Sequence, residues 1–126
     1  MSVAHLEIPP HIAVYHAQSA DMAQWQPVLH GMEEEGIPYQ VSQKQEVGVS
    51  AAQTAYQAAQ LSPLGVGVFC DRNEIIVHNK NLPQDHPLFT VQLSANTTEQ
   101  ELRHLGCNAA RLVKGLPFIS NQDGWQ

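Results

Sequence analysis

The stretch LGVGVFC, residues 64–70, runs directly into the turn sequence DRN and then into EIIVH, residues 74–78. The first run is apolar on both faces, which is typical of a central strand that helices cover on each side. So short a link permits only an antiparallel neighbour, because parallel strands need a crossover connection. Residues 64–78 therefore predict a central strand followed at once by an antiparallel partner.

Two strand–helix units are predicted on the amino-terminal side of this hairpin. Short runs at residues 11–15 and 39–42 have the composition and the flanking turn residues of strands. Between them Asp21 and Gln24 resemble a capping pair that opens a helix, and Pro27 suits the first turn if the regular helix begins late. Residues 50–53 form a capping box that opens an alanine-rich helix, and Pro63 ends that helix. The apolar residues at helical spacing in the first helix are Trp25, Val28, Leu29 and Met32.

The carboxyl-terminal side completes the pattern with a fifth strand at residues 88–93 and a long helix from residues 96–98 to Gly115. The order βαβαβββα requires right-handed crossovers and helices on both faces of the sheet. We therefore expect an α/β fold, a three-layer α/β/α sandwich around a five-stranded mixed sheet with one antiparallel strand. Residues 11–120 are expected to form this single domain, between tails at residues 1–10 and 121–126.

Composition excludes several classes of function. The 126 residues carry a formal charge of -6, and no basic run exceeds one residue, so neither nucleic acid nor an anionic membrane is an expected partner. The longest apolar run is too short to span a bilayer. Residues 1–10 lack the apolar core of a signal peptide, and Cys70 and Cys107 are expected to be reduced thiols, so we expect a cytoplasmic protein. Charged residues make up only 14%, which favours a surface that is easily desolvated against a partner.

The most unusual local feature is the run of three glutamates at residues 33–35, in the last turn of the first helix. A carboxylate there opposes the helix dipole and costs ~0.3 kcal/mol or more, so local stability does not explain the run. Carboxylate oxygens are the ligands that Mg²⁺ and Ca²⁺ prefer, and Mg²⁺ often takes one or two from protein. Two interpretations remain open, a solvated helix end and a metal shared with a partner chain.

Other candidate sites are weaker. The seven histidines show no zinc-ligand spacing. Gly65 and Gly67 lie inside a predicted strand and indicate close backbone packing, and no GxxxxGKS or GxxxxGKT loop exists, so we expect the chain alone to bind no nucleotide. A Cys70–His78 catalytic pair is conceivable across the hairpin. It lacks an orienting third group, so we expect no catalytic residue.

Four stretches together resemble the small subunits of diol and glycerol dehydratase reactivating factors. The resemblance covers most of residues 11–118 in order, and its last stretch is the most specific. The stretches are GMEEEGIP at residues 31–38, SPLGVG at residues 62–67, HNKNLP with PLF at residues 78–89, and GCNAARLVKGLPF at residues 106–118.

This resemblance implies a function that periodicity does not show. Such subunits pair with a large, actin-like ATPase subunit in a two-plus-two, chaperone-like assembly that releases damaged cobalamin from an inactivated dehydratase. They are similar to the dehydratase medium subunit, and they are thought to take its place transiently on the dehydratase large subunit. The resemblance also implies a strand order of 2-1-3-4-5. It further implies that Glu34 reaches a Mg or Ca ion shared with the large ATPase subunit. A bacterial microcompartment is an alternative location to the open cytoplasm.

Two alternatives remain. The chain could be the medium subunit of the dehydratase itself, although it is expected to lack the extra amino-terminal portion of that subunit. It could also be a free-standing doubly wound ligand-binding domain. A phosphoacceptor version of such a domain needs paired acids after the first strand, where this chain has Tyr15 and His16.

Overall fold

The computed structural model describes residues 9–44 and 48–120. The predicted tails therefore lie outside the described residues, apart from Pro9 and Pro10. The elements follow the predicted order: β1 (Ile12–His16), α1 (Met22–Glu34), β2 (Tyr39–Gln43), α2 (Ala51–Leu61), β3 (Val66–Cys70), β4 (Glu74–Asn79), β5 (Phe89–Gln92) and α3 (Glu99–Lys114).

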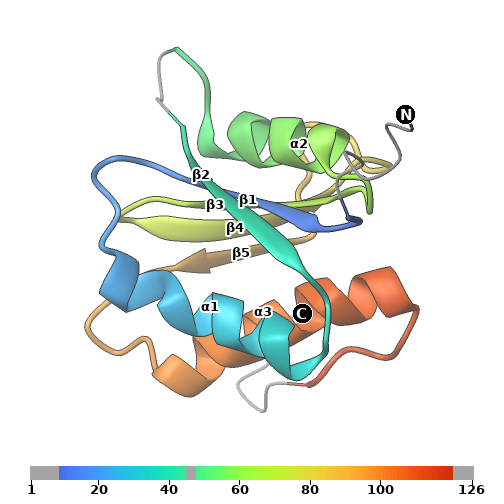
Figure 1. The fold of residues 1–126 in the computed structure, drawn as a ribbon. Helices are drawn as coiled ribbons and strands as arrows, with labels where there is room; N and C mark the ends of the chain where they lie inside the picture. Colours follow the sequence, from blue (N-terminus) through green and yellow to red (C-terminus); the bar gives the residue numbers. More distant parts are fainter. Residues whose placement is uncertain (1–8, 45–47, 121–126) are drawn as a thin grey trace, which may run out of the picture.

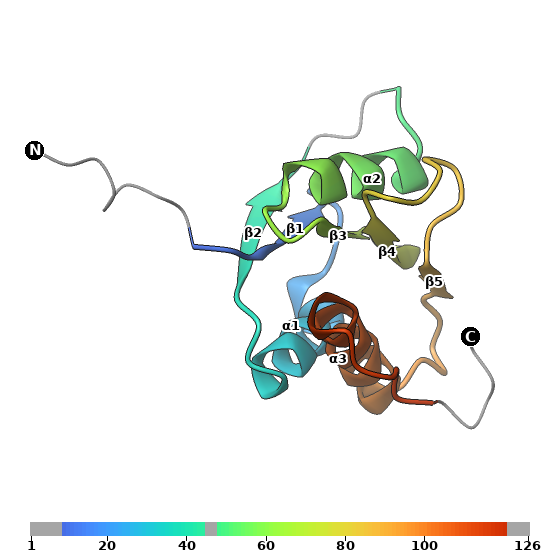
Figure 2. The same ribbon diagram turned by 90° about the vertical axis from the view of Figure 1, so that its right-hand side faces the viewer.

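The sheet has the order β2-β1-β3-β4-β5, as predicted. β1 pairs in parallel with β2 and β3, whereas β4 is antiparallel to both of its neighbours, so it is the one antiparallel strand. Helix α2 covers one face of the sheet, and α1 and α3 lie side by side on the other (Figures 1 and 2). The three-layer prediction is confirmed.

Caps determine where the helices begin. Ser50 and Gln53 form the predicted capping box of α2, and Thr98 forms another with Glu101 at the start of α3. The predicted cap at Asp21 is confirmed, and the alternative of a later start with Pro27 in the first turn is wrong. Asp21 accepts a hydrogen bond from the Ala23 backbone amide and starts the helix at Met22, so Pro27 lies inside it and is buried.

The core lies mainly between the sheet and the α1–α3 layer. Its buried side chains include Ile12 and Val14 of β1, Val66 and Val68 of β3, and Trp25 of α1. A smaller cluster lies under α2, where a Cβ on Gly67 would meet the Ala59 backbone nitrogen at 2.2 Å. The expectation of close backbone packing is therefore confirmed for Gly67, whereas Gly65 precedes β3, has a φ of 74° and lies next to the Lys80 side chain.

Helices α1 and α3 approach each other so closely that their backbones touch at two glycines. A Cβ on Gly106 would lie 1.8 Å from the Val28 carbonyl oxygen, and one on Gly31 would lie 2.0 Å from the Arg103 carbonyl oxygen. The contacts pair the start of α1 with the start of α3 and the end of α1 with the second half of α3, so the helices run parallel. This register places the α1 glutamates against the polar side of α3.

Replacing Gly106 by alanine should destabilise the domain, because the new methyl group meets backbone and the helices must separate. We expect the free energy of unfolding in urea to fall by about 3 kcal/mol. Gly36→Ala is the matched control, since that glycine has a φ of 74° but no atom within 4 Å of an added Cβ. Its cost should stay near ~1 kcal/mol, the strain of a left-handed conformation. Equal stability of Gly106→Ala and the unsubstituted protein would refute the close contact.

Candidate functional site

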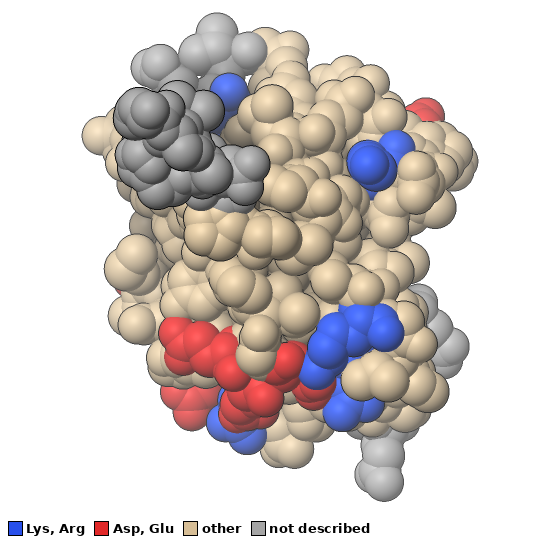
Figure 3. Space-filling view, turned by 45° about the vertical axis from the view of Figure 1, so that its right-hand side comes forward, with Lys and Arg blue, Asp and Glu red and all other residues tan. Residues whose placement is uncertain are grey.

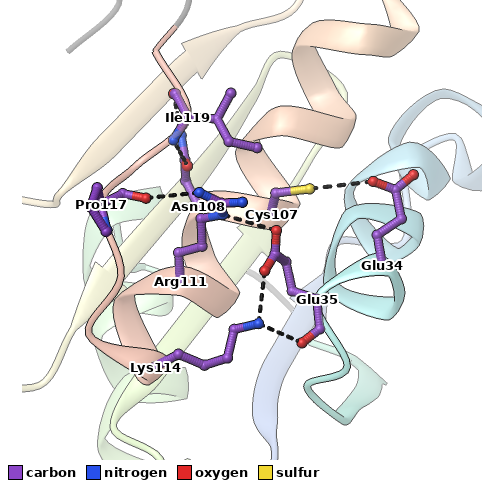
Figure 4. A network of polar contacts seen from close by, with 8 residues as sticks. All are labelled: Glu34, Glu35, Cys107, Asn108, Arg111, Lys114, Pro117 and Ile119. Carbon is purple, nitrogen blue, oxygen red and sulfur yellow. Dashed lines mark hydrogen bonds and ion pairs between the residues drawn. The ribbon is translucent and has the colours of Figure 1, made fainter.

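The carboxyl-terminal end of α1 carries three consecutive glutamates, and two of them, Glu34 and Glu35, contact α3. Four polar residues of α3 face this end of α1 at intervals of three or four positions, and Figure 4 shows three of them with Glu34 and Glu35. In Figure 3 acidic and basic side chains form one band on a face that is otherwise largely uncharged. The four α3 residues are Arg103, Cys107, Arg111 and Lys114.

Glu35 stabilises the fold through ion pairs with α3. Its side chain is only 12% exposed, and its carboxylate accepts from Lys114 Nζ at 2.7 Å and from Arg111 Nε at 2.9 Å. Lys114 Nζ also donates to the Glu35 backbone carbonyl at 2.8 Å. These hydrogen bonds, first from Lys114 and then from Arg111, hold the pKa of the Glu35 carboxyl below its usual value. Arg111 and Lys114 therefore hold the end of α1 against the end of α3 through Glu35.

Glu33 contacts the sheet rather than α3. The Tyr39 hydroxyl, at the start of β2, donates to Glu33 Oε2 at 2.5 Å. This hydrogen bond, together with partial burial of the ring, raises the pKa of Tyr39 to about 12. Glu33 thus joins the end of α1 to the strand that follows it.

Of the three glutamates, Glu34 has the longest contacts. Its side chain is 55% exposed, and its partners are Arg103 Nε at 3.2 Å and the Cys107 thiol, which donates at 3.6 Å. Burial and then the bond to Glu34 raise the pKa of Cys107 to about 11, so the thiol stays protonated. An exposed ion pair of this kind contributes about 0.2–1 kcal/mol. The Glu34 carboxylate is therefore available to a further ligand at little cost to the domain.

Against α3, the described part of the site offers one exposed carboxylate, that of Glu34, and no closed metal centre. Within residues 9–44 and 48–120, no three His, Cys, Asp or Glu side chains gather in a group that could hold a metal ion. An exposed carboxylate can supply one oxygen to Mg²⁺ or Ca²⁺ and leave the other positions to water and a partner. The dipole cost expected from the sequence is offset, because α3 provides cations for Glu34 and Glu35 that the sequence of α1 alone does not show.

The hairpin provides no catalytic pair. Cys70 packs in the core on the α1–α3 side, whereas His78 contacts Tyr56 of α2 and pairs with Gly67 at the other end of the hairpin. The His78 ring is buried between the Gln84 carbonyl and the Asn79 amide. Burial also raises the pKa of the Cys70 thiol. The two side chains lie on opposite faces of the sheet, which agrees with rejecting that hypothesis.

Sequence reasoning missed the α3 side of the site. Cys107, Arg111 and Lys114 follow one another at four and three positions, which is the spacing of a single helix face. That signal lay within the stretch of residues 106–118. The spacing indicates one polar face of the last helix. It does not show that this face contacts Glu34 and Glu35, which lie more than 70 positions earlier in the chain.

Comparisons with known proteins identify the family. The model of the dehydratase medium subunit family matches residues 9–119. The diol dehydratase-reactivating factor small subunit of Klebsiella michiganensis is 51% identical over 94 residues, which cover 75% of this chain and 72% of that protein. The chain belongs to the small-subunit family of dehydratase-reactivating factors. The propanediol dehydratase-reactivating factor small subunit of Salmonella typhimurium is also 51% identical, over 75% of this chain and 78% of that protein.

Solved structures agree with this family assignment. A structure of diol dehydratase-reactivating factor complexed with ADP and Mg²⁺ contains a chain that is 43% identical, with a TM-score of 0.79, and the match covers 90% of this chain and 100% of that one. A chain of a glycerol dehydratase reactivase is 33% identical, with a TM-score of 0.80, over 89% of this chain and 98% of that one. Membership of the small-subunit family implies a large-subunit partner.

The Glu35 contacts predict a pH-dependent stability difference. The folded pKa of Glu35 lies below its unfolded value, so its stabilisation is present above the unfolded pKa and is lost as pH falls through the folded pKa. Glu35→Gln should therefore lower the free energy of unfolding by about 1–2 kcal/mol at pH 7. This difference from the unsubstituted protein should vanish in acid, as measured by urea denaturation across pH.

Glu33→Gln is the matched control, because an amide oxygen still accepts from Tyr39. Its effect at pH 7 should be about 0.5 kcal/mol or less. A Glu35→Gln difference that does not change with pH would contradict the role of the ionised carboxylate.

Proposed function

We propose that this chain is the small subunit of an ATP-dependent, chaperone-like factor that releases damaged cobalamin from inactivated diol dehydratase. In this proposal it transiently takes the place of the dehydratase medium subunit on the dehydratase large subunit, which opens the enzyme and lets the cofactor leave. The client is diol rather than glycerol dehydratase, because the chain is 43% identical to the diol factor and 33% identical to the glycerol factor.

One observation carries this proposal. The same domain, residues 9–119, matches the dehydratase medium subunit family and is half identical to small subunits of the reactivating factor. Two chains with one shape can compete for one surface, and specificity then rests on contacts that only one of them makes. Only 14% of the residues are charged, so the surface is easily desolvated, which suits an interface that forms and dissociates repeatedly.

The proposal gives this chain no reaction of its own. ATP binding and hydrolysis are assigned to the large subunit, as the family resemblance implies. The ADP and Mg²⁺ in the related complex belong to that complex as a whole. The proposed location is the cytoplasm, with a bacterial microcompartment as the alternative. Among residues 9–44 and 48–120, no helix combines the length and the apolar character needed to cross a membrane.

Glu34 is the proposed metal ligand of this chain. Its carboxylate is more exposed than that of Glu35, the other carboxylate in the α1–α3 contact, and its contacts are longer, and Mg²⁺ or Ca²⁺ binds such an oxygen readily. The cation would replace the Arg103 guanidinium at Glu34, and the large subunit would supply further ligands. Glu33 and Glu35 are occupied by Tyr39 and by Arg111 with Lys114, so they are poor competitors for the ion.

Glu34→Ala should weaken the complex with the large subunit roughly tenfold or more when Mg²⁺ is present, because a metal ligand is lost. The melting temperature of the isolated chain should hardly change, since loss of the exposed ion pair and relief of the helix dipole oppose each other. Isothermal titration calorimetry with the large subunit, with Mg²⁺ and with EDTA, measures the first effect.

Glu33→Ala is the control for that experiment, because it also removes an exposed carboxylate from the same turn. It should leave the Mg²⁺ dependence of binding intact. Equal affinity of the unsubstituted chain and Glu34→Ala in Mg²⁺ would remove the metal role from Glu34.

A further inference from the structure

The chain turns back on itself after α3 and forms a short extended segment, residues 116–119, which we call the C-terminal strap. Gly115 adopts the left-handed conformation, with a φ of 71°, and ends the helix. The Leu116 amide then donates to the Arg111 carbonyl at 3.0 Å, which directs the strap back along α3. No regular helix or strand includes the strap, so its position depends on side chains of α3.

Two α3 side chains fix the strap. Asn108 is buried, and its amide pairs with both backbone polar groups of Ile119: Oδ1 accepts from the amide at 2.6 Å, and Nδ2 donates to the carbonyl at 3.1 Å. Arg111 Nη1 donates to the Pro117 carbonyl at 3.1 Å. The Phe118 ring also meets the Phe89 ring edge-on, with centroids 5.2 Å apart. The strap is therefore ordered by a buried amide, a guanidinium and a ring contact.

This ordering presents apolar side chains to solvent. Leu116 is 45% exposed and Phe118 is 42% exposed, and both belong to the small set of large hydrophobic residues that are exposed within the described ranges. A buried polar side chain that fixes an exposed apolar segment does little for the solubility of the isolated domain. It does lower the entropy cost of binding, because the segment is already ordered before a partner arrives.

The strap continues the surface that carries Glu34. Arg111 connects them directly, since its Nε donates to Glu35 at 2.9 Å while its Nη1 donates to the strap. Figure 4 shows Pro117 and Ile119 on one side of Arg111 and the end of α1 with Glu34 and Glu35 on the other. An apolar strip beside a carboxylate and its cations has the composition of an interface core with a polar rim.

We infer that the C-terminal strap is the apolar part of the surface by which this chain binds its large subunit, beside the metal contact at Glu34. This inference rests on the proposed function. Leu116 and Phe118 insert into an apolar depression of the large subunit, while the ion at Glu34 fixes the orientation of the two chains. The large subunit is the occupant because Arg111 joins the strap to Glu35, the neighbour of Glu34, and because small-subunit membership implies such a partner.

The test compares two leucine-to-serine variants of the full chain in complex with the large subunit. Leu116→Ser removes an apolar contact from the strap, and we expect the dissociation constant to rise roughly tenfold, as at a central interface residue. Leu61→Ser is the matched control, because Leu61 is 69% exposed at the end of α2 on the opposite layer. It should leave the dissociation constant unchanged. The melting temperature of each isolated variant shows that both remain folded.

The outcomes separate this inference from the proposed function. If Leu116→Ser binds like the unsubstituted chain while Glu34→Ala binds weakly, the strap is no part of the interface and the metal contact stands. If Leu61→Ser is the weakened variant, the large subunit binds the α2 layer, and the inference is wrong. If Leu116→Ser weakens binding and Glu34→Ala does not, the strap inference holds and the metal role fails.

Discussion

Helices α1 and α3 meet through their backbones at Gly31 and Gly106, and the arrangement of the polar site follows from that contact. Neither position has space for a Cβ atom, so the helices cannot separate or shift along each other without losing it. The contact brings Glu34 to Arg103 and Cys107, and it brings Glu35 to Arg111 and Lys114. The close backbone contacts at these two glycines therefore determine which carboxylate forms buried ion pairs within the domain and which one stays exposed.

Three adjacent glutamates have three different tasks because their side chains leave the helix end in different directions. Glu35 has two cations within hydrogen-bond distance and is nearly buried, whereas Glu33 accepts from Tyr39 of the next strand. Glu34, between them, keeps an exposed ion pair and a weak thiol bond. Arg111 extends the same network to the C-terminal strap, so the proposed metal contact and the proposed apolar contact depend on the same α1–α3 register.

The parts of the fold that depend on local signals could be predicted from the sequence. The apolar stretch at residues 64–70 and its short turn predicted β3 and its antiparallel neighbour, and the capping box at residues 50–53 predicted the start of α2. The Asp21 cap of α1 was also visible in the sequence, whereas the later start that Pro27 suggested is wrong, because the helix holds a buried proline in its interior. The partners of the glutamates could not be predicted, since Glu35 and Arg111 lie 76 positions apart and only the packing of α1 on α3 joins them. The candidate residue Glu34 came from a family resemblance, and its exposure beside Arg103 is visible only in the structure.

In the proposed function this domain acts by its shape, replacing a dehydratase subunit that it resembles, rather than by a reaction of its own. Its match to the medium subunit family over residues 9–119 makes such replacement physically reasonable. In the most direct measurement, the complete reactivating factor is mixed with ADP and with inactivated diol dehydratase that holds damaged cobalamin. The complexes are then separated on a native gel. Replacement predicts a new complex that contains this chain and the dehydratase large subunit, together with free dehydratase medium subunit. If damaged cobalamin leaves the dehydratase while the medium subunit stays fully bound, replacement is contradicted.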